Sequence, residues 1–169
     1  MIAKAATISH GGNAVRYSVN KDKAEIVKVN FLPDDISAEA MYQRMVLKQK
    51  EFASTINKGR LLKRNVIRME ISPTKEESAG WTLDDWVRLA NEYIQVFDSI
   101  DLSKKTKRAS AKSTNVKNSQ YVVALHHDAK SGILHLHIDV NRVDMNGTVN
   151  DDHLIAERAM SAAYIINER

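Results

Sequence analysis

The sequence predicts an α+β fold, a two-layer sandwich in which helices pack on one face of a central antiparallel sheet. Three observations lead to this class. Strand-like and helix-like stretches alternate along the chain. The last two strand-like stretches are joined by a short turn, which is typical of an antiparallel hairpin. In the last of these stretches apolar residues alternate with polar ones, so that its apolar face is expected against the helices and its other face open.

The strands are expected in five stretches, of which the first, 2–8, ends before the pair Gly11-Gly12. The stretch 24–31 is β-like by composition, although an extended loop would also fit. In 66–72, Ile67, Met69 and Ile71 alternate with Arg68, Glu70 and Ser72. The two remaining strands, 120–127 and 133–143, flank the turn of the hairpin.

Four helices are expected between and after these strands. The first covers about 13–20, and the second begins after its N-cap, Ser37. The third is capped by Thr82 and carries an apolar stripe that packs on the sheet. The fourth covers 151–168, and its abrupt end leads us to expect the N-terminal catalytic part of a longer protein.

The composition indicates one globular domain over 1–169, with 43% hydrophobic and 27% charged residues. The absence of cysteine excludes disulfides and thiolate chemistry. No apolar run is long enough for a transmembrane helix, and there is no secretory signal. We therefore expect a cytoplasmic protein that acts as a monomer.

The net charge of +4 is concentrated in two places. Residues 103–118 contain six Lys or Arg and no acidic residue, and 101–118 is expected to be a flexible loop. A second basic cluster lies in KGRLLKRNVIR and consists of Lys58, Arg60, Lys63, Arg64 and Arg68. Such patches indicate that a polyanion is held at particular places, although a solvated loop gives the same pattern.

Four of the six histidines fall within twelve residues, in HHDAKSGILHLH. On a strand, His135 and His137 point to the same face, together with Asp139 and Asn141. The alternation of the neighbouring strand favours His126 over His127 on that face. Three imidazoles from paired strands predict a metal site with open coordination positions, of a kind that suits Zn²⁺ or another transition metal. Histidines that are exposed or singly hydrogen-bonded are the alternative.

QYVVALHHD, followed by HLHIDVNRVDMNG, resembles the metal-binding motif of plasmid mobilization relaxases, which belong to the HUH single-strand endonucleases. The opening MIAKAATISHGGNAVRYSVN is similar to the segment that presents the nucleophilic tyrosine in that family, and Tyr17 occupies its place. The segment RMEISPTKEESAGWTLDDWVRLANEYI resembles the second family motif. The positions that match the metal-binding motif in order are His126, Asp128, His135, His137, Asn141 and Arg142.

The resemblance implies a MobA/VirD2-like relaxase that nicks single-stranded DNA at an origin of transfer. Tyr17 would form a 5′-phosphotyrosine, and His126, His135 and His137 would hold Mg²⁺ or Mn²⁺ at the scissile phosphate. Accessory mobilization and coupling proteins would be its partners. Two other interpretations stay open: a rolling-circle replication initiator, and a basic DNA-binding module whose histidines hold a structural ion.

The remaining candidate residues have weaker support. Asp128 could orient a histidine or cap a turn. Glu70 and Ser72 share a strand face with Arg68 and could line the same cleft, although an ion pair would also explain the charged ones. Asn141 is expected near the site. The expected DNA-binding residues are basic: Arg68, Lys104, Lys105, Lys107, Arg108 and Arg142. The other tyrosines, Tyr42, Tyr93, Tyr121 and Tyr164, are expected in the core.

Overall fold

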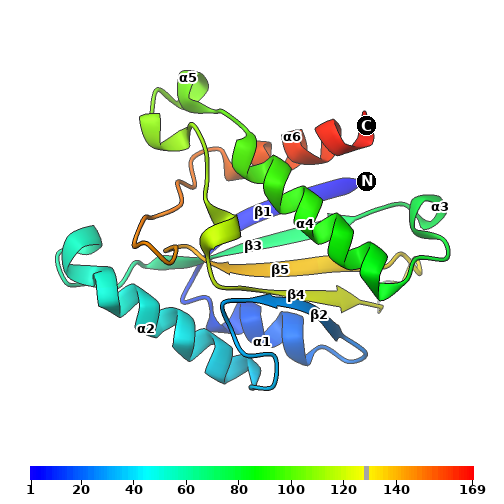
Figure 1. Ribbon diagram of the computed structural model, residues 1–169, viewed down its shortest axis with the longest axis horizontal. Helices are drawn as coiled ribbons and strands as arrows, with labels where there is room; N and C mark the ends of the chain where they lie inside the picture. Colours follow the sequence, from blue (N-terminus) through cyan, green and yellow to red (C-terminus); the bar gives the residue numbers. More distant parts are fainter. Residues whose placement is uncertain (128–129) are drawn as a thin grey trace.

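A computed structural model describes residues 1–127 and 130–169. Its centre is a sheet of five strands in the order β1-β3-β5-β4-β2, and every neighbouring pair is antiparallel (Figure 1). The strands are β1 (Ile2–Ser9), β2 (Glu25–Asn30), β3 (Arg64–Ser72), β4 (Tyr121–His126) and β5 (His135–Asn141). The predicted class, α+β with an antiparallel sheet, is therefore confirmed.

The helices begin where the sequence supplies caps. The Ser37 side chain accepts a hydrogen bond from the backbone of Ala40, and Thr82 forms a capping box with Asp85. The longer helices are α1 (Gly12–Asn20), α2 (Ala38–Asn57), α4 (Leu83–Ser99) and α6 (Ile155–Asn167). The short ones are α3 (Lys75–Ser78), α5 (Ser103–Thr106), η1 (Ala109–Ala111) and η2 (Val116–Asn118).

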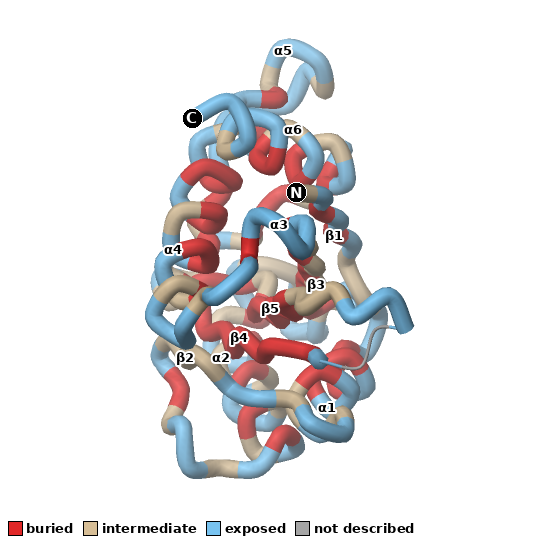
Figure 2. The backbone as a smooth tube through the Cα atoms, turned by 90° about the vertical axis from the view of Figure 1, so that its right-hand side faces the viewer, coloured by how far each residue is buried: buried red, intermediate tan, exposed pale blue. Residues whose placement is uncertain are grey.

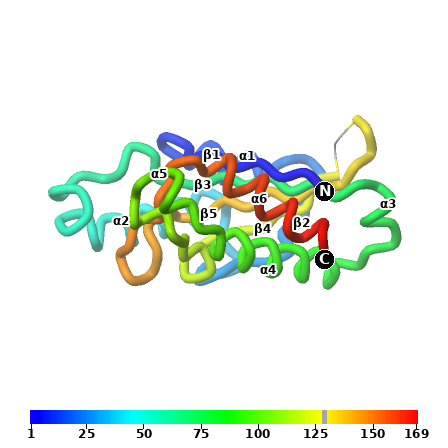
Figure 3. Tube along the Cα trace, turned by 90° about the horizontal axis from the view of Figure 1, so that it is seen from above, coloured from blue at the N-terminus to red at the C-terminus, as the bar shows by residue number. Residues whose placement is uncertain are grey.

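The main core lies between one face of the sheet and helices α4 and α6. The apolar positions of β3 and β5 point into it, as their alternation predicts, and meet the aromatic stripe of α4. Figures 1 and 3 show α4 crossing this face, and Figure 2 shows that the buried chain runs through the strands and the inward side of α4. The polar positions of these strands therefore point to the opposite face of the sheet, where a functional site can form.

We expected all helices to pack on one face of the sheet, and this expectation is wrong. A second, smaller core lies on the other face, where α1 and α2 pack against Val66 of β3 and Val122 of β4. These two valines interrupt an otherwise polar face, and Val15 and Met41 cover them. The helices therefore leave only part of that face open.

The basic segment 101–118 has more regular structure than the flexible loop that we expected. It forms α5, η1 and η2. The buried Asp98 holds its second half, because its carboxylate accepts hydrogen bonds from the Thr114 hydroxyl at 2.6 Å and from the backbone of Val116 and Lys117 at 2.8 and 3.0 Å. A buried carboxylate of this kind fixes a loop that its composition alone would leave mobile.

Candidate active site

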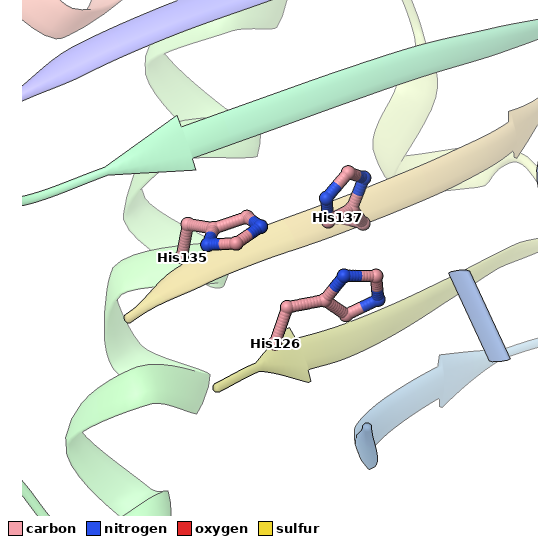
Figure 4. Close-up of side chains that lie close together, drawn as sticks. All are labelled: His126, His135 and His137. Carbon is pink, nitrogen blue, oxygen red and sulfur yellow. The ribbon is translucent and has the colours of Figure 1, made fainter. Parts of the chain in front are cut away.

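Three histidines meet where β4 ends and β5 begins. His126 is the register partner of His135, and His137 follows two residues later on the same face of β5. One ring nitrogen from each residue lies within 4.8 Å of the others. Figure 4 shows the three rings side by side. His126 and His137 are buried, while His135 is half-buried and leaves one side accessible.

The ring of His126 is oriented by helix α1. Its Nε2 lies 2.8 Å from the backbone oxygen of Ser18. A neutral ring that donates from Nε2 keeps its lone pair on Nδ1, and such a contact with a backbone carbonyl is typical of metal-binding histidines. His127 is exposed instead, and its Nε2 lies 3.8 Å from the carboxylate of Glu25. The alternation of β4 thus places His126, and not His127, beside the other two.

This donor set fits a divalent cation. Three imidazoles with protein on one side and an accessible edge on the other form an open site of the catalytic kind. A second cluster, Asp151, Asp152 and His153, also brings possible ligands together. Its carboxylates already bind Arg108 and Arg142 at 3.0 and 3.1 Å, so that cluster is explained by internal ion pairs.

Tyr17 lies beside the histidines. Its ring centroid is 5.7 Å from that of His126 and 5.6 Å from that of His137. The side chain is 42% exposed, so a substrate can reach it. The Arg68 guanidinium and the Lys21 ammonium each lie 5.2 Å from the ring centroid. The site therefore combines a phenol, a histidine triad and two cations.

The other tyrosines lie in different surroundings. Tyr93 and Tyr121 are buried, and the Tyr93 hydroxyl donates to the backbone oxygen of Ala159. Tyr42 accepts a hydrogen bond from Asn65. The expectation of a core position is wrong for Tyr164, which is 66% exposed on the outside of α6.

A buried acid, Asp139, lies on β5 two residues after His137. Asp139 is the register partner of Arg68 and is fully buried. Among the described residues its carboxyl oxygens have no partner in normal hydrogen-bond geometry. Burial raises its pKa to about 7, against the opposing effects of the nearby Ser18 hydroxyl and the Arg68 charge. The alternation put Asp139 on the histidine face, but a single aspartate in a strand gave no reason to assign it a role.

The open part of the face is built by β3. Arg68, Glu70 and Ser72 are half-buried, and Glu70 is the register partner of His137. The structure therefore brings these three residues together next to the triad. Asp128 lies outside the described residues.

Asn141 is on the predicted face but not at the site. It is fully buried under α2, where its amide donates to the Met45 backbone oxygen and to Gln120 and accepts from Gln49 and the Val143 backbone. All four bonds are internal. The expectation that Asn141 lies in the cleft is therefore wrong.

The expected DNA-binding residues separate into three groups. Arg68 lies at the site. Arg142 and Arg108 form ion pairs with Asp152 and Asp151, and Lys105 forms one with Glu157. Lys104 and Lys107 are exposed. The segment that carries them, around α5, lies at the end of the molecule opposite the start of β5, as Figures 1 and 3 agree.

An open sheet face that carries a histidine triad next to a tyrosine can hold a divalent cation beside a nucleophile, as a metal-dependent phosphotransfer enzyme requires. The family model of the MobA/VirD2-like relaxase nuclease domain matches residues 17–167. The chain belongs to this family and is a DNA-nicking relaxase. The sequence resemblance and the enzymatic interpretation are thereby confirmed.

The fold is also similar to a solved structure, the conjugative relaxase TrwC in a metal-bound complex with oriT DNA. The two share 11% identity with a TM-score of 0.54, over 99% of this chain and 67% of that one. No curated protein sequence matches the chain. Within the part of the chain that the structure describes, no helix is both long and apolar enough to cross a membrane.

Proposed function

We propose that this relaxase domain nicks one strand of DNA at an origin of transfer and that Tyr17 is its nucleophile. The observation that carries the proposal is the position of Tyr17, an accessible phenol whose ring lies less than 6 Å from two of the triad rings. Family membership supports the nicking reaction, and this geometry supports the choice of residue.

The reaction is a transesterification. The Tyr17 phenol loses its proton, its oxygen forms a bond to the scissile phosphorus, and the bond from phosphorus to the 3′ oxygen breaks. The products are a 5′-phosphotyrosine and a 3′-hydroxyl, which takes up a proton. Because the phosphodiester energy is kept in the new bond, the strand can be joined again after transfer.

The chain's own residues prepare this step. Helix α1 carries both Tyr17 and the Ser18 carbonyl that orients His126, so the nucleophile and the triad are fixed relative to each other. Arg68 and Lys21 place positive charge where the phosphate must approach. A divalent cation held by His126, His135 and His137 would polarise the non-bridging phosphate oxygens. We propose Mg²⁺ or Mn²⁺ in the cell, although three imidazoles also suit Zn²⁺ in vitro.

The partners and location follow from the same proposal. The substrate would be single-stranded DNA at the origin of transfer, because an extended strand can lie on the open part of the sheet. We propose that the protein acts as a monomer in the cytoplasm, with accessory mobilization and coupling proteins.

The test is formation of a covalent adduct. The protein is incubated with origin DNA and Mn²⁺, and denaturing electrophoresis detects a protein band linked to DNA. Tyr17→Phe should still bind the strand but form no adduct. Tyr164→Phe, which removes an exposed hydroxyl on α6, is the matched control and should react like the parent. An adduct of unchanged yield with Tyr17→Phe would refute the assignment.

Chelation of the metal tests its role. Without the cation, nicking should stop while the melting temperature falls by only a few degrees, because the core forms without the triad. A collapse of the melting temperature would instead show that the ion holds the fold together.

A further inference from the structure

A basic loop, 58–64, takes no part in the reaction proposed above. It joins α2 to β3 and contains no acidic residue. Its basic side chains are exposed, namely Lys58, Arg60, Lys63 and Arg64. None of these side chains forms an ion pair or a hydrogen bond with any other residue that the structure describes. The loop therefore presents four uncompensated charges to solvent.

Several basic side chains elsewhere on the surface have acidic partners, whereas others, such as Lys104 and Lys107, are exposed singly or in pairs. In α1 and α2 the pairs are Arg16 with Glu39 and Lys48 with Glu51, and in the other expected DNA-binding segment Lys105 pairs with Glu157. Such pairs cancel most of the local field. Loop 58–64 keeps its field, which is the property that attracts an external polyanion.

The backbone of this loop is held at both ends. The Gly59 amide donates to the Ala53 carbonyl at 2.9 Å, and the His10 amide donates to the Lys63 carbonyl at 3.2 Å. The Arg142 side chain donates to the Arg64 carbonyl at 3.1 Å. Because the backbone is already ordered, a ligand that binds the side chains has to fix only those side chains.

The loop lies far from the triad. Arg64 begins β3, and Glu70, six residues later, is the register partner of His137. At about 3.3 Å per residue, these positions are about 20 Å apart along the strand. Figures 1 and 3 show the segment after α2 at the end of the molecule opposite the start of β5. Stacked nucleic acid rises about 3.4 Å per nucleotide, so this distance corresponds to about six nucleotides.

We propose that loop 58–64 is a second phosphate-binding surface, which holds the backbone of the same DNA about six nucleotides from the scissile phosphate. This inference rests on the proposed function for the identity of the polyanion. Its contribution would be to affinity and not to the chemical step, because no side chain of the loop can reach the triad over that distance.

The test compares DNA of two lengths. One oligonucleotide of the nicked strand extends three nucleotides to each side of the scissile phosphate, and the other extends fifteen. The affinity of each is measured in a Tyr17→Phe background, where the strand is not cut, for the parent and for Arg60→Ser/Lys63→Ser. The matched control, Arg88→Ser/Arg169→Ser, removes the same charge from two exposed arginines, one on α4 and one after α6, outside both basic segments. Melting temperatures check that all variants fold.

The loop variant should bind the long strand about tenfold more weakly than the parent and with a weaker dependence on salt, while its affinity for the short strand stays the same. The control should match the parent on both strands. An equal loss on both strands, or no loss on the long one, would overturn the proposal.

The outcome can be separated from that of the nicking proposal. If the Tyr17-containing parent forms no adduct, the nicking proposal fails, and the loop is then tested with (dT)30, because phosphate contacts do not depend on sequence. Weaker binding of (dT)30 by the loop variant alone supports the loop surface. Equal binding by the parent, the loop variant and the control contradicts it.

Discussion

The two ends of β5 both bury polar side chains, but their surroundings differ. At its start, His135 and His137 lie with His126 beside Tyr17, and the carboxyl of Asp139, two residues further on, lacks a regular hydrogen-bond partner among the described residues. At its end, Asn141 makes four internal hydrogen bonds. Burying a polar group without a partner costs free energy, so the first arrangement needs a functional reason and the second has a structural one.

The largest expected effect is at the start of β5. His137→Ala removes one ligand of the proposed cation, and we expect nicking to fall by about a thousandfold with little change in melting temperature. Binding of Mn²⁺, followed by calorimetry, should weaken in parallel. The control is His127→Ala, which removes the exposed imidazole that directly follows β4. Equal Mn²⁺ affinity in both variants would remove His137 from the metal site.

The opposite pattern is expected at the end of β5. Asn141→Ala removes four buried hydrogen bonds, to Gln49, Gln120 and the backbone of Met45 and Val143, and should lower the free energy of unfolding by about 3 kcal/mol. Denaturant unfolding measures this change. The nicking rate per folded molecule should stay close to that of the parent. A folded, fully stable variant with impaired nicking would move Asn141 into the active site.

A smaller effect is expected from Arg68, the register partner of Asp139, whose guanidinium lies 5.2 Å from the Tyr17 ring centroid. Arg68→Gln should slow adduct formation about tenfold at saturating DNA, about 1.4 kcal/mol, because the ring loses the cation on its face. The control is Arg88→Gln, which removes an exposed arginine of α4. If only the affinity for DNA falls and the saturated rate is unchanged, Arg68 is a phosphate contact and does not position the ring.

The comparison also explains which parts could be predicted from the sequence. Alternation within β3, β4 and β5 correctly predicted the faces, including that of His126, because a strand side chain has only two directions. The same rule put Asn141 on the histidine face but could not show that α2 covers that end. Arg108 and Arg142 are expected to bind DNA because they are basic, but in the structure they form ion pairs with Asp151 and Asp152. These pairs arise from tertiary packing, which the sequence pattern does not reveal. Periodicity gives the direction of a side chain but not its neighbours.

The smallest expected effect concerns Asp151, which follows β5 and whose carboxylate, like the Asn141 amide, has several internal hydrogen bonds. Burial works to raise its pKa, but hydrogen bonds from the Ser110 hydroxyl, the His153 backbone and Arg108 outweigh it and hold the pKa well below the usual range. An aspartate in the unfolded chain titrates near pH 3.9, so above that pH both states are ionised and the native bonds stabilise the fold in full. As the pH falls below about 4, the unfolded chain takes up a proton that the folded chain does not, and this stabilisation is lost.

Asp151→Asn should therefore be less stable than the parent by about 1 kcal/mol at pH 7, and the difference should shrink as the pH falls below 4 in denaturant titrations. A difference that stays constant through this range would show that the carboxylate charge does not stabilise this end of the sheet.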